Sequence, residues 1–184
     1  MLHIPPLSAL GCRIVIFGPS NSGKSTLAAA LSDKLSIPAV HLDQLHHQPH
    51  SNWVPRPREE FRALQRAAIA EPAWIMDGNY SALTQERLAR ATGAIVLDEN
   101  HWLRLWRYFR RTLFERNRHG ALQGSQDSVK WSMIHWVAVA SRHNGARYRA
   151  MVDDTNLSRV YCRSMAEVRQ LYRHWNLKHP RPPT

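Results

Sequence analysis

Residues 14–31 read "IVIFGPSNSGKSTLAAAL", an apolar run that breaks into glycine, proline and serine and then resumes at helical spacing around one lysine. Within this stretch, residues 18–25 fit the pattern G-x-x-x-x-G-K-[ST], with a strand expected before it and a helix after it. Small residues let successive backbone N–H groups point into one concavity, and the positive end of the helix adds its field. The stretch therefore predicts a Walker A loop that binds the phosphates of a nucleotide.

Each position of this loop has an expected role. Lys24 should reach the β- and γ-phosphate oxygens and act in catalysis, and the Ser25 hydroxyl is a candidate ligand of Mg²⁺. A turn that merely caps a helix needs one glycine and no lysine, so that simpler interpretation explains less. We therefore expect ATP and Mg²⁺ as cofactors. The residues expected to bind the nucleotide are Gly18, Pro19, Ser20, Asn21, Ser22, Gly23, Lys24, Ser25 and Thr26.

Length and composition indicate one globular domain. The chain has 184 residues, enough for one buried core, and its apolar runs are far shorter than the ~20 residues that cross a bilayer. The start, "MLHIPPLSALGC", has no basic segment of the kind that opens a secretion signal. The two cysteines lie far apart without a CxxC pattern, which suits free thiols in a reducing compartment. We expect a cytoplasmic protein with no membrane partner.

The net positive charge comes entirely from the second half of the chain. The formal net charge is +11, but residues 1–100 carry nine Lys or Arg against nine Asp or Glu, whereas residues 101–184 carry sixteen against five. Such an excess suits an anionic partner, nucleic acid included. A solvated basic face is the alternative, and composition alone leaves both open.

Short apolar runs alternate with helical patterns, which is typical of a parallel α/β sheet. Ser164, followed by Glu167, predicts a capping box that opens the last helix. Leucines at positions 27, 31 and 35 should share one face of the helix after the loop. The expected strands are residues 13–17, 39–43, 73–80, 93–99 and 159–163, the third of them breaking at Gly78. The expected later helices are residues 58–70, 85–90, 102–113, 129–143 and the segment after 164.

Two acidic positions compete for the metal. "AWIMDGNY", residues 73–80, puts Asp77 at the end of the third strand, where a metal-organising carboxylate is expected. "AIVLDE" ends in Asp98 and Glu99, as in motor ATPases, so these remain the alternative. No N-K-x-D follows a later strand, which excludes guanine recognition by that route. We expect Ser25 and Asp77 to serve the metal.

The stretches "GPSNSGKST", "HLDQLHHQPHSNWVPRPREEF", "AWIMDGNYS" and "LWRYFRRTL" together resemble the small P-loop proteins known as adenylate-kinase-related or DNA topology modulation proteins. The resemblance covers residues 12–115. It implies a nucleotide-kinase-like P-loop NTPase fold: a five-stranded parallel sheet with helices on both faces and a helical lid. It also implies an acceptor site shaped by the loop after the second strand, an arginine-bearing lid after the fourth, and Asp77 holding Mg²⁺ through water.

On this basis residues 1–184 form a single P-loop kinase-like domain. Its core spans residues 12–100, with an acceptor-site insertion at 44–72. An arginine-rich helical lid follows at 101–152, and residues 153–178 supply the last strand and helix.

Several side chains are candidates for catalysis and acceptor binding. Arg107 and Arg111 lie on one face of an expected helix and are proposed lid cations, although a solvated face remains the alternative. Asp43, at the expected end of the second strand, could accept a hydroxyl proton or cap the next turn. Asn79 and Tyr80 stand where adenylate kinases carry the aromatic, proline and arginine that fix a nucleoside monophosphate, so ordinary adenylate kinase activity is not expected. The expected substrate-binding set is Asp43, Arg58, Asp77, Asn79 and Tyr80.

Three histidines, His46, His47 and His50, are a weak metal candidate because Pro49 interrupts the helix that would align them. Trp53 could stack on an acceptor ring or pin its own loop. The sequence thus predicts an ATP-dependent kinase that transfers the γ-phosphate to a small acceptor without naming that acceptor. The alternatives are a nucleotide-switched nucleic-acid-binding regulator and an ATPase.

Overall fold

The computed structural model describes residues 3–51, 53–98 and 144–180. The expected helices at 102–113 and 129–143 lie outside these residues. The elements in chain order are η1 (Leu7–Leu10, a 3₁₀ helix), β1 (Arg13–Phe17), α1 (Lys24–Leu35), β2 (Ala39–His41), α2 (Leu42–His46), α3 (Arg58–Ala70), β3 (Trp74–Asp77), α4 (Thr84–Arg90), β4 (Gly93–Leu97), α7 (Asn144–Asp153), β5 (Ser158–Cys162) and α8 (Met165–His174).

The five strands form one parallel sheet, as predicted, and their order is β2-β3-β1-β4-β5. Because all strands point the same way, their carboxyl ends share one edge. The register pairs Ile16 of β1 with Asp77 of β3, and Asp77 with His41 of β2. The loop that follows β1 therefore begins near the carboxyl ends of β3, which adjoins β1, and of β2 beyond it.

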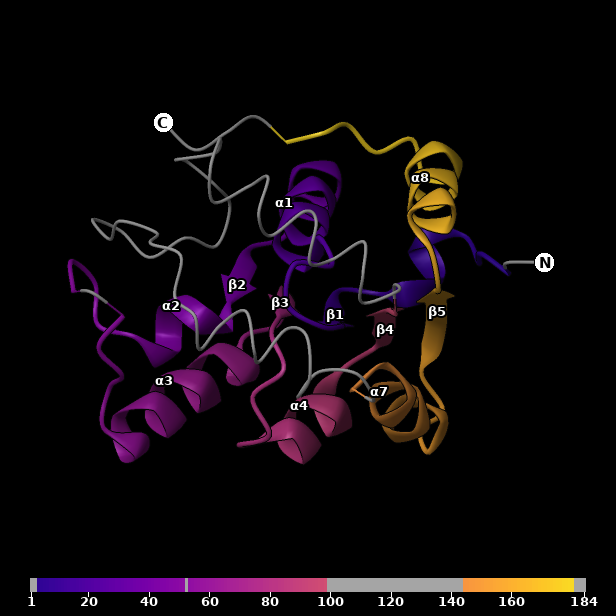
Figure 1. The fold of residues 1–184 in the computed structure, drawn as a ribbon. Helices are drawn as coiled ribbons and strands as arrows, with labels where there is room; N and C mark the ends of the chain where they lie inside the picture. The colour runs from indigo at the N-terminus through magenta and orange to yellow at the C-terminus, as the bar shows by residue number, and fades with distance from the viewer. Residues whose placement is uncertain (1–2, 52, 99–143, 181–184) are drawn as a thin grey trace.

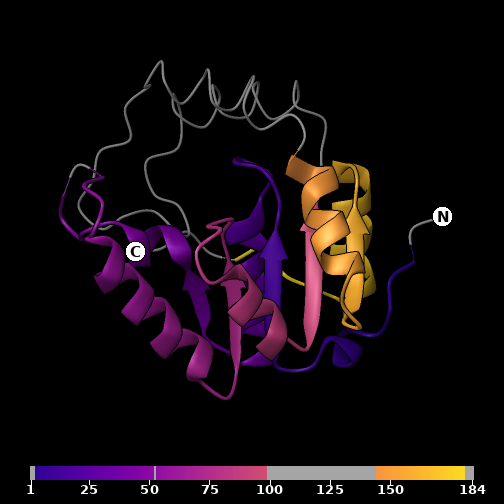
Figure 2. The ribbon, with the colours of Figure 1, turned by 90° about the horizontal axis from the view of Figure 1, so that it is seen from below.

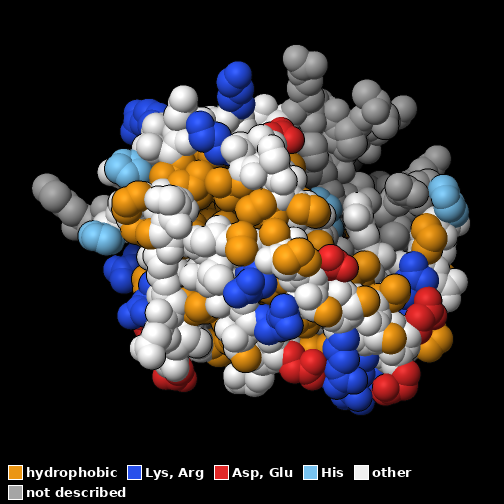
Figure 3. Space-filling view, turned by 180° about the vertical axis from the view of Figure 1, so that it is seen from behind, with side chains coloured by type: hydrophobic (Ala, Val, Ile, Leu, Met, Phe, Trp, Pro, Cys, Tyr) orange, Lys and Arg blue, Asp and Glu red, His pale blue; other side chains and the backbone are white. Residues whose placement is uncertain are grey.

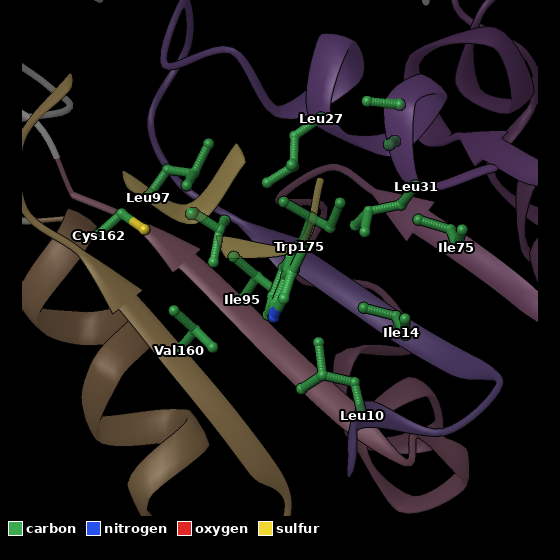
Figure 4. Packing of buried hydrophobic residues seen from close by; sticks show 14 of the residues in the cluster. Leu10, Ile14, Leu27, Leu31, Ile75, Ile95, Leu97, Val160, Cys162 and Trp175 are labelled. Carbon is green, nitrogen blue, oxygen red and sulfur yellow. The ribbon is translucent and has the colours of Figure 1, made fainter. Parts of the chain in front are cut away.

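Helices cover both faces of the sheet. In Figure 1, α1 and α8 lie on one face, and Figure 2 shows α3, α4 and α7 in front of the other. Under α1 and α8, Leu27 and Leu31 pack with Ile14, Ile95 and other fully buried side chains (Figure 4). Leu35 is partly buried against the same cluster, so the predicted apolar face of α1 is confirmed.

The opposite face has its own apolar cluster, which draws on α3, α4 and α7. Phe17 and Trp74 from the sheet pack there with Ile69, Leu88 and Val152. The helical spacing in residues 58–70 predicts that Phe61, Leu64 and Ala68 face inward. The structure buries Phe61, Gln65 and Ile69 and leaves Leu64 and Ala68 partly buried. Residues 144–152 of the expected lid belong to α7, whose Tyr148 and Val152 are buried in this cluster.

The second strand is shorter than predicted. It ends at His41 rather than residue 43, and Asp43 lies in the first turn of α2. β3 ends at Asp77, the partner of His41, so nothing remains for Leu42 to pair with. Leu42 is fully buried and packs against Gly78, where an added Cβ would lie 2.7 Å from the Leu42 Cβ. The prediction that β2 ends in the Asp43 carboxylate was therefore wrong.

The other strands differ from prediction only at their ends. β3 ends at Asp77, directly before the expected break at Gly78. β4 stops at Leu97, two residues before the predicted end at residue 99, and β5 begins and ends one residue early. None of the helices in the described part of the chain is long and apolar enough to cross a bilayer.

The predicted capping box opens α8. The Ser164 Oγ accepts a hydrogen bond of 3.2 Å from the Glu167 backbone N–H, and the Glu167 carboxylate accepts one of 2.5 Å from the Arg163 N–H. These contacts provide acceptors for backbone N–H groups at the start of the helix, which have no acceptor within the helix itself. At the other end of α8, the Trp175 Nε1 donates to the Pro5 carbonyl at 2.9 Å. The helix is thus anchored at both ends.

We predict that Ser164→Ala lowers the free energy of unfolding by about 1 kcal/mol, because one amide of α8 loses its acceptor. Urea unfolding at neutral pH measures this change. Ser32→Ala, within α1, is the matched control and should stay within about 0.5 kcal/mol of wild type. Equal effects of the two substitutions would contradict the importance of the cap.

Candidate nucleotide-binding site

The loop between β1 and α1 depends on two glycines. Gly18 has φ 148° and lies so close to β4 that an added Cβ would be 2.4 Å from the Leu97 carbonyl oxygen. Gly23 is the N-cap of α1 with φ 89°, and a Cβ there would meet nothing within 4 Å. Asn21, at φ 63°, takes the third left-handed position, which asparagine tolerates well. The loop therefore curls over the end of β1 with its backbone open on the Gly23 side.

The first turn of α1 supplies the amides of a candidate phosphate cradle. Leu27 makes the first intrahelical bond, from its N–H to the Gly23 carbonyl at 2.9 Å, so the N–H groups of residues 24–26 have no acceptor within the helix. Ser22 is 2% exposed, and its Oγ has no hydrogen-bond partner among the described residues. Unsatisfied donors at a helix N-terminus match the needs of an anion such as a phosphate.

Lys24 begins α1 and lies over the loop. Its Nζ donates to the Pro19 carbonyl at 2.9 Å, which spans the cradle from one side to the other. The residue is half-buried, and its charge contributes to the electrostatics of Asp77. A lysine held in this way is positioned to bind phosphate oxygens.

Asp77 is the central acidic group of the site. Its carboxylate is almost fully buried and accepts hydrogen bonds from the Ser25 Oγ at 2.7 Å and the His41 Nδ1 at 2.6 Å. Burial alone would raise the pKa of Asp77. The bonds from His41 and Ser25, with the charges of His41 and Lys24, outweigh it and hold that pKa below its ordinary value.

Ser25 and Asp77 fit Mg²⁺ chemically. Magnesium prefers oxygen ligands and keeps several waters, so one hydroxyl and one carboxylate beside phosphate oxygens are a sufficient protein contribution. Within the described residues no cluster of three or more His, Cys, Asp or Glu side chains could hold a metal by itself. Ser25 and Asp77, the predicted pair, lie in hydrogen-bond contact. The histidines at 46, 47 and 50 form no metal-binding cluster.

Asn79 faces the phosphate loop. Its side-chain Oδ1 accepts from the Gly18 N–H at 3.2 Å, and its Nδ2 donates to the Gly18 carbonyl at 2.6 Å. One side-chain amide thereby pairs with both backbone groups of the first loop residue. The acceptor contact expected of Asn79 remains a prediction.

Tyr80 and Asp43, two of the expected acceptor ligands, lie together. The Tyr80 hydroxyl donates to the Asp43 Oδ1 at 2.8 Å. Burial, together with the charge of Asp43 and this hydrogen bond, raises the pKa of Tyr80, so the phenol stays neutral. The Tyr80 ring stacks on His46 at 4.6 Å between centroids and meets the edge of Phe61 at 5.2 Å. The tyrosine is thus fixed, and it directs the exposed carboxylate of Asp43.

The remaining candidates are less closely connected to the cradle. Arg58 is exposed at the start of α3. Arg107, Arg111 and Glu99 lie outside the described residues. Asp98 forms an ion pair with Arg149 of α7, whereas Asp77 contacts Ser25. Trp53 meets the edge of the His47 ring at 5.1 Å between centroids.

A groove of ≈ 490 Å³ opens beside the cradle, between the start of α1 and α8. Three loop and helix residues, Ser22, Gly23 and Thr26, form one wall. Arg169 and Arg173 lie one turn apart on α8 and line the other. The groove therefore continues from the phosphate cradle along a partly basic surface.

Sequence reasoning missed two residues of this site. His41 was assigned to a strand without a role, although a polar residue that ends a strand beside another strand's terminal aspartate could have signalled the contact. Arg87 of α4 is 1% exposed, and burial lowers its pKa to about 10, against a small opposing effect of Tyr148. Its pattern on a short helix looks like any surface arginine, so no signal in the sequence identified it.

Comparison with solved structures places the fold. The chain is similar to a gluconokinase from Sinorhizobium meliloti, with 16% identity, 91% of this chain and 93% of that chain covered, and a TM-score of 0.53. A shikimate kinase from Bacteroides thetaiotaomicron gives 17% identity, coverage of 90% and 99%, and a TM-score of 0.49. No protein-family model and no curated protein matches the sequence. The chain therefore shares its fold, a five-stranded parallel sheet with helices on both faces, with that gluconokinase; the resemblance to adenylate-kinase-related and DNA topology modulation proteins stays a prediction.

We predict that His41→Phe lowers the free energy of unfolding by about 1–3 kcal/mol at neutral pH, because it leaves a buried oxygen of Asp77 without a donor. His41→Asn, whose Nδ2 can take the place of the histidine Nδ1, is the matched control and should lose less. Urea unfolding at a series of pH values measures both.

The pH dependence has a definite sign. An aspartate ordinarily has a pKa of 3.8, and Asp77 stays ionised below that pH in the folded wild type, so stability falls there as the unfolded chain gains a proton. His41→Phe raises the pKa of Asp77 in the folded protein, so the variant loses less stability than wild type as the pH falls. The gap between the two proteins should therefore shrink as the pH drops below about 4, and a constant gap would contradict the proposed contact.

Proposed function

We propose that this protein is an ATP-dependent phosphotransferase that moves the γ-phosphoryl group of ATP to a small acceptor. The observation that supports the proposal most directly is the Ser25–Asp77 hydrogen bond, because it joins the two side chains that we propose as magnesium ligands, and Ser25 directly follows Lys24. Phosphoryl transfer needs little covalent chemistry from a protein beyond positioning and charge stabilisation. These residues offer both at one edge of the sheet.

The nucleotide would be held by parts of the chain that are already in place. The open amides of α1 and the loop bind the β- and γ-phosphates, and Lys24 exchanges the Pro19 carbonyl for a phosphate oxygen. Ser25 and Asp77 would hold Mg²⁺, which neutralises charge on the phosphates when bound. The nucleoside would extend into the groove between α1 and α8, since that groove begins at Gly23 and Thr26.

The acceptor would bind beside Asp43. Tyr80 engages Oδ1 of this carboxylate, and Oδ2 has no hydrogen-bond partner among the described residues. A carboxylate whose one oxygen is held by a hydrogen bond can accept the proton of an attacking hydroxyl with its other oxygen. Arg58, Arg107 and Arg111 remain proposed ligands of the acceptor or of the transferring group. The acceptor itself can be sought by measuring ADP release with nucleoside monophosphates and small hydroxyl compounds.

The nucleic-acid-binding alternative has no support in the described residues. On the face drawn in Figure 3, Lys and Arg side chains are scattered among acidic, apolar and other side chains and form no continuous basic stripe. A basic stripe or patch is what a nucleic-acid interface would need. We therefore do not propose it.

We predict that Lys24→Ala lowers MgATP turnover on the order of 100-fold or more, because the phosphates lose the ammonium that spans the cradle. Lys34→Ala, an exposed lysine in the last turn of α1, is the matched control. ADP release and ATP affinity should be measured on both variants. Wild-type turnover in Lys24→Ala would contradict the proposed function.

We also predict that Arg111→Ala lowers the rate of phosphoryl transfer more than it lowers ATP affinity, since a lid cation acts mainly in the transition state. Comparing kcat with the Kd for MgATP separates the two effects. Equal losses in rate and affinity would instead assign Arg111 to ground-state binding.

A further inference from the structure

Arg87 is a buried cation that the proposed chemistry does not use. It projects from α4, is 1% exposed and still carries its charge at neutral pH. Burying a guanidinium is costly unless its donors are satisfied, and arginine in such a place is usually paired with a carboxylate. Here the hydrogen-bond partners among the described residues are two carbonyls and one hydroxyl. Arg87 is thus a buried cation with no carboxylate partner among the described residues, at a position where an apolar side chain would cost less to bury.

All three partners belong to the segment between β3 and the start of α4. Arg87 donates from NH1 to the Gly78 carbonyl at 3.3 Å, and from NH2 to the Tyr80 carbonyl at 2.8 Å and the Thr84 Oγ1 at 3.1 Å. The two carbonyls bracket Asn79, the residue whose side chain pairs with both backbone groups of Gly18. The planar fork thus fixes the backbone on both sides of Asn79.

The same guanidinium also contacts the strand that leads into the phosphate loop. Its Cζ lies 5.5 Å from the ring centroid of Phe17, the residue directly before Gly18. Phe17 in turn stacks on Tyr148 of α7, with centroids 5.4 Å apart. Arg87 therefore touches the chain at both ends of the Asn79–Gly18 contact.

We propose that Arg87 is a positioning residue that sets the geometry of the phosphate loop by holding Asn79 against Gly18. A guanidinium can do this because it supplies several donors in one rigid plane and stacks its face on an aromatic ring, whereas lysine supplies a single point charge. Its consequence for phosphoryl transfer rests on the proposed function; its consequence for the Gly18 amide does not.

The first test is independent of activity. In ¹⁵N NMR spectra, the amide proton of Gly18 should shift upfield in Asn79→Ala, which removes its acceptor, and in the same direction in Arg87→Lys. Arg90→Lys is the matched control, because Arg90 is an exposed arginine on the same helix that also donates to a carbonyl, that of Ala70 at 3.2 Å. It should leave the Gly18 amide unchanged.

The second test uses MgATP turnover. Arg87→Lys and Asn79→Ala should each lower kcat by about ten-fold or more, since small misplacements of a catalytic loop are expensive. The kcat of the double variant should be no lower than that of the less active single variant, because Arg87 acts through Asn79. If wild type shows no turnover at all, the proposed function fails, and the NMR comparison still decides the role of Arg87.

A purely structural arginine would give a different result. Arg87→Lys would then melt at a lower temperature while the Gly18 amide shift and the turnover of the folded protein stayed at wild-type values, and this outcome would overturn the proposal. If Arg87→Lys does not fold, Thr84→Val replaces it. That variant removes a hydroxyl that accepts from Arg87 and donates to the Tyr80 carbonyl at 2.9 Å, and the same two readouts decide.

Discussion

The hydrogen bond between Ser25 and Asp77 joins the first turn of α1 to the carboxyl end of β3, and the rest of the candidate site is arranged around it. It is possible because β1 and β3 are parallel neighbours in a register that pairs Ile16 with Asp77. The loop after β1 then returns into α1 directly above the end of β3. A shift of one residue in this register would turn Asp77 to the opposite face of the sheet, so the apolar packing on both faces indirectly fixes the polar site.

The polar edge costs stability that the two apolar layers must offset. Asp77 and Arg87 are nearly excluded from water, and Ser22 carries an unsatisfied hydroxyl among the described residues. Isolated buried charges are unfavourable. Fixed hydrogen bonds compensate Asp77, and they compensate NH1 and NH2 of Arg87, whose Nε has no partner among the described residues. Such preorganised groups need little rearrangement when an anion binds, which is the property that a phosphate-transfer site requires.

Much of the fold could be predicted because it follows from local patterns. The apolar runs, the spacing of leucines 27, 31 and 35, and the Ser164 capping box each depend on neighbours in sequence. The errors concern tertiary contacts. β2 ended early because its pairing partner ended, which placed Asp43 on a helix, and the contacts of His41 and Asn79 depend on which strands are adjacent. Arg87 escaped notice because burial of a charged side chain cannot be deduced from a short helix.

The two halves of the site differ in their exposure to water, and this difference bears on how they would act. Gly18, Ser22 and Asp77 are buried, so electrostatic interactions at the phosphate end are screened weakly even before a ligand binds. Asp43 and Arg58 are exposed, and charges in water contribute little until solvent is removed. In the proposed function, the nucleotide half would therefore be formed in advance, whereas the acceptor half would gain strength only when a bound acceptor displaces water around Asp43. Specificity for the acceptor should accordingly depend more on what excludes that water than on the carboxylate itself.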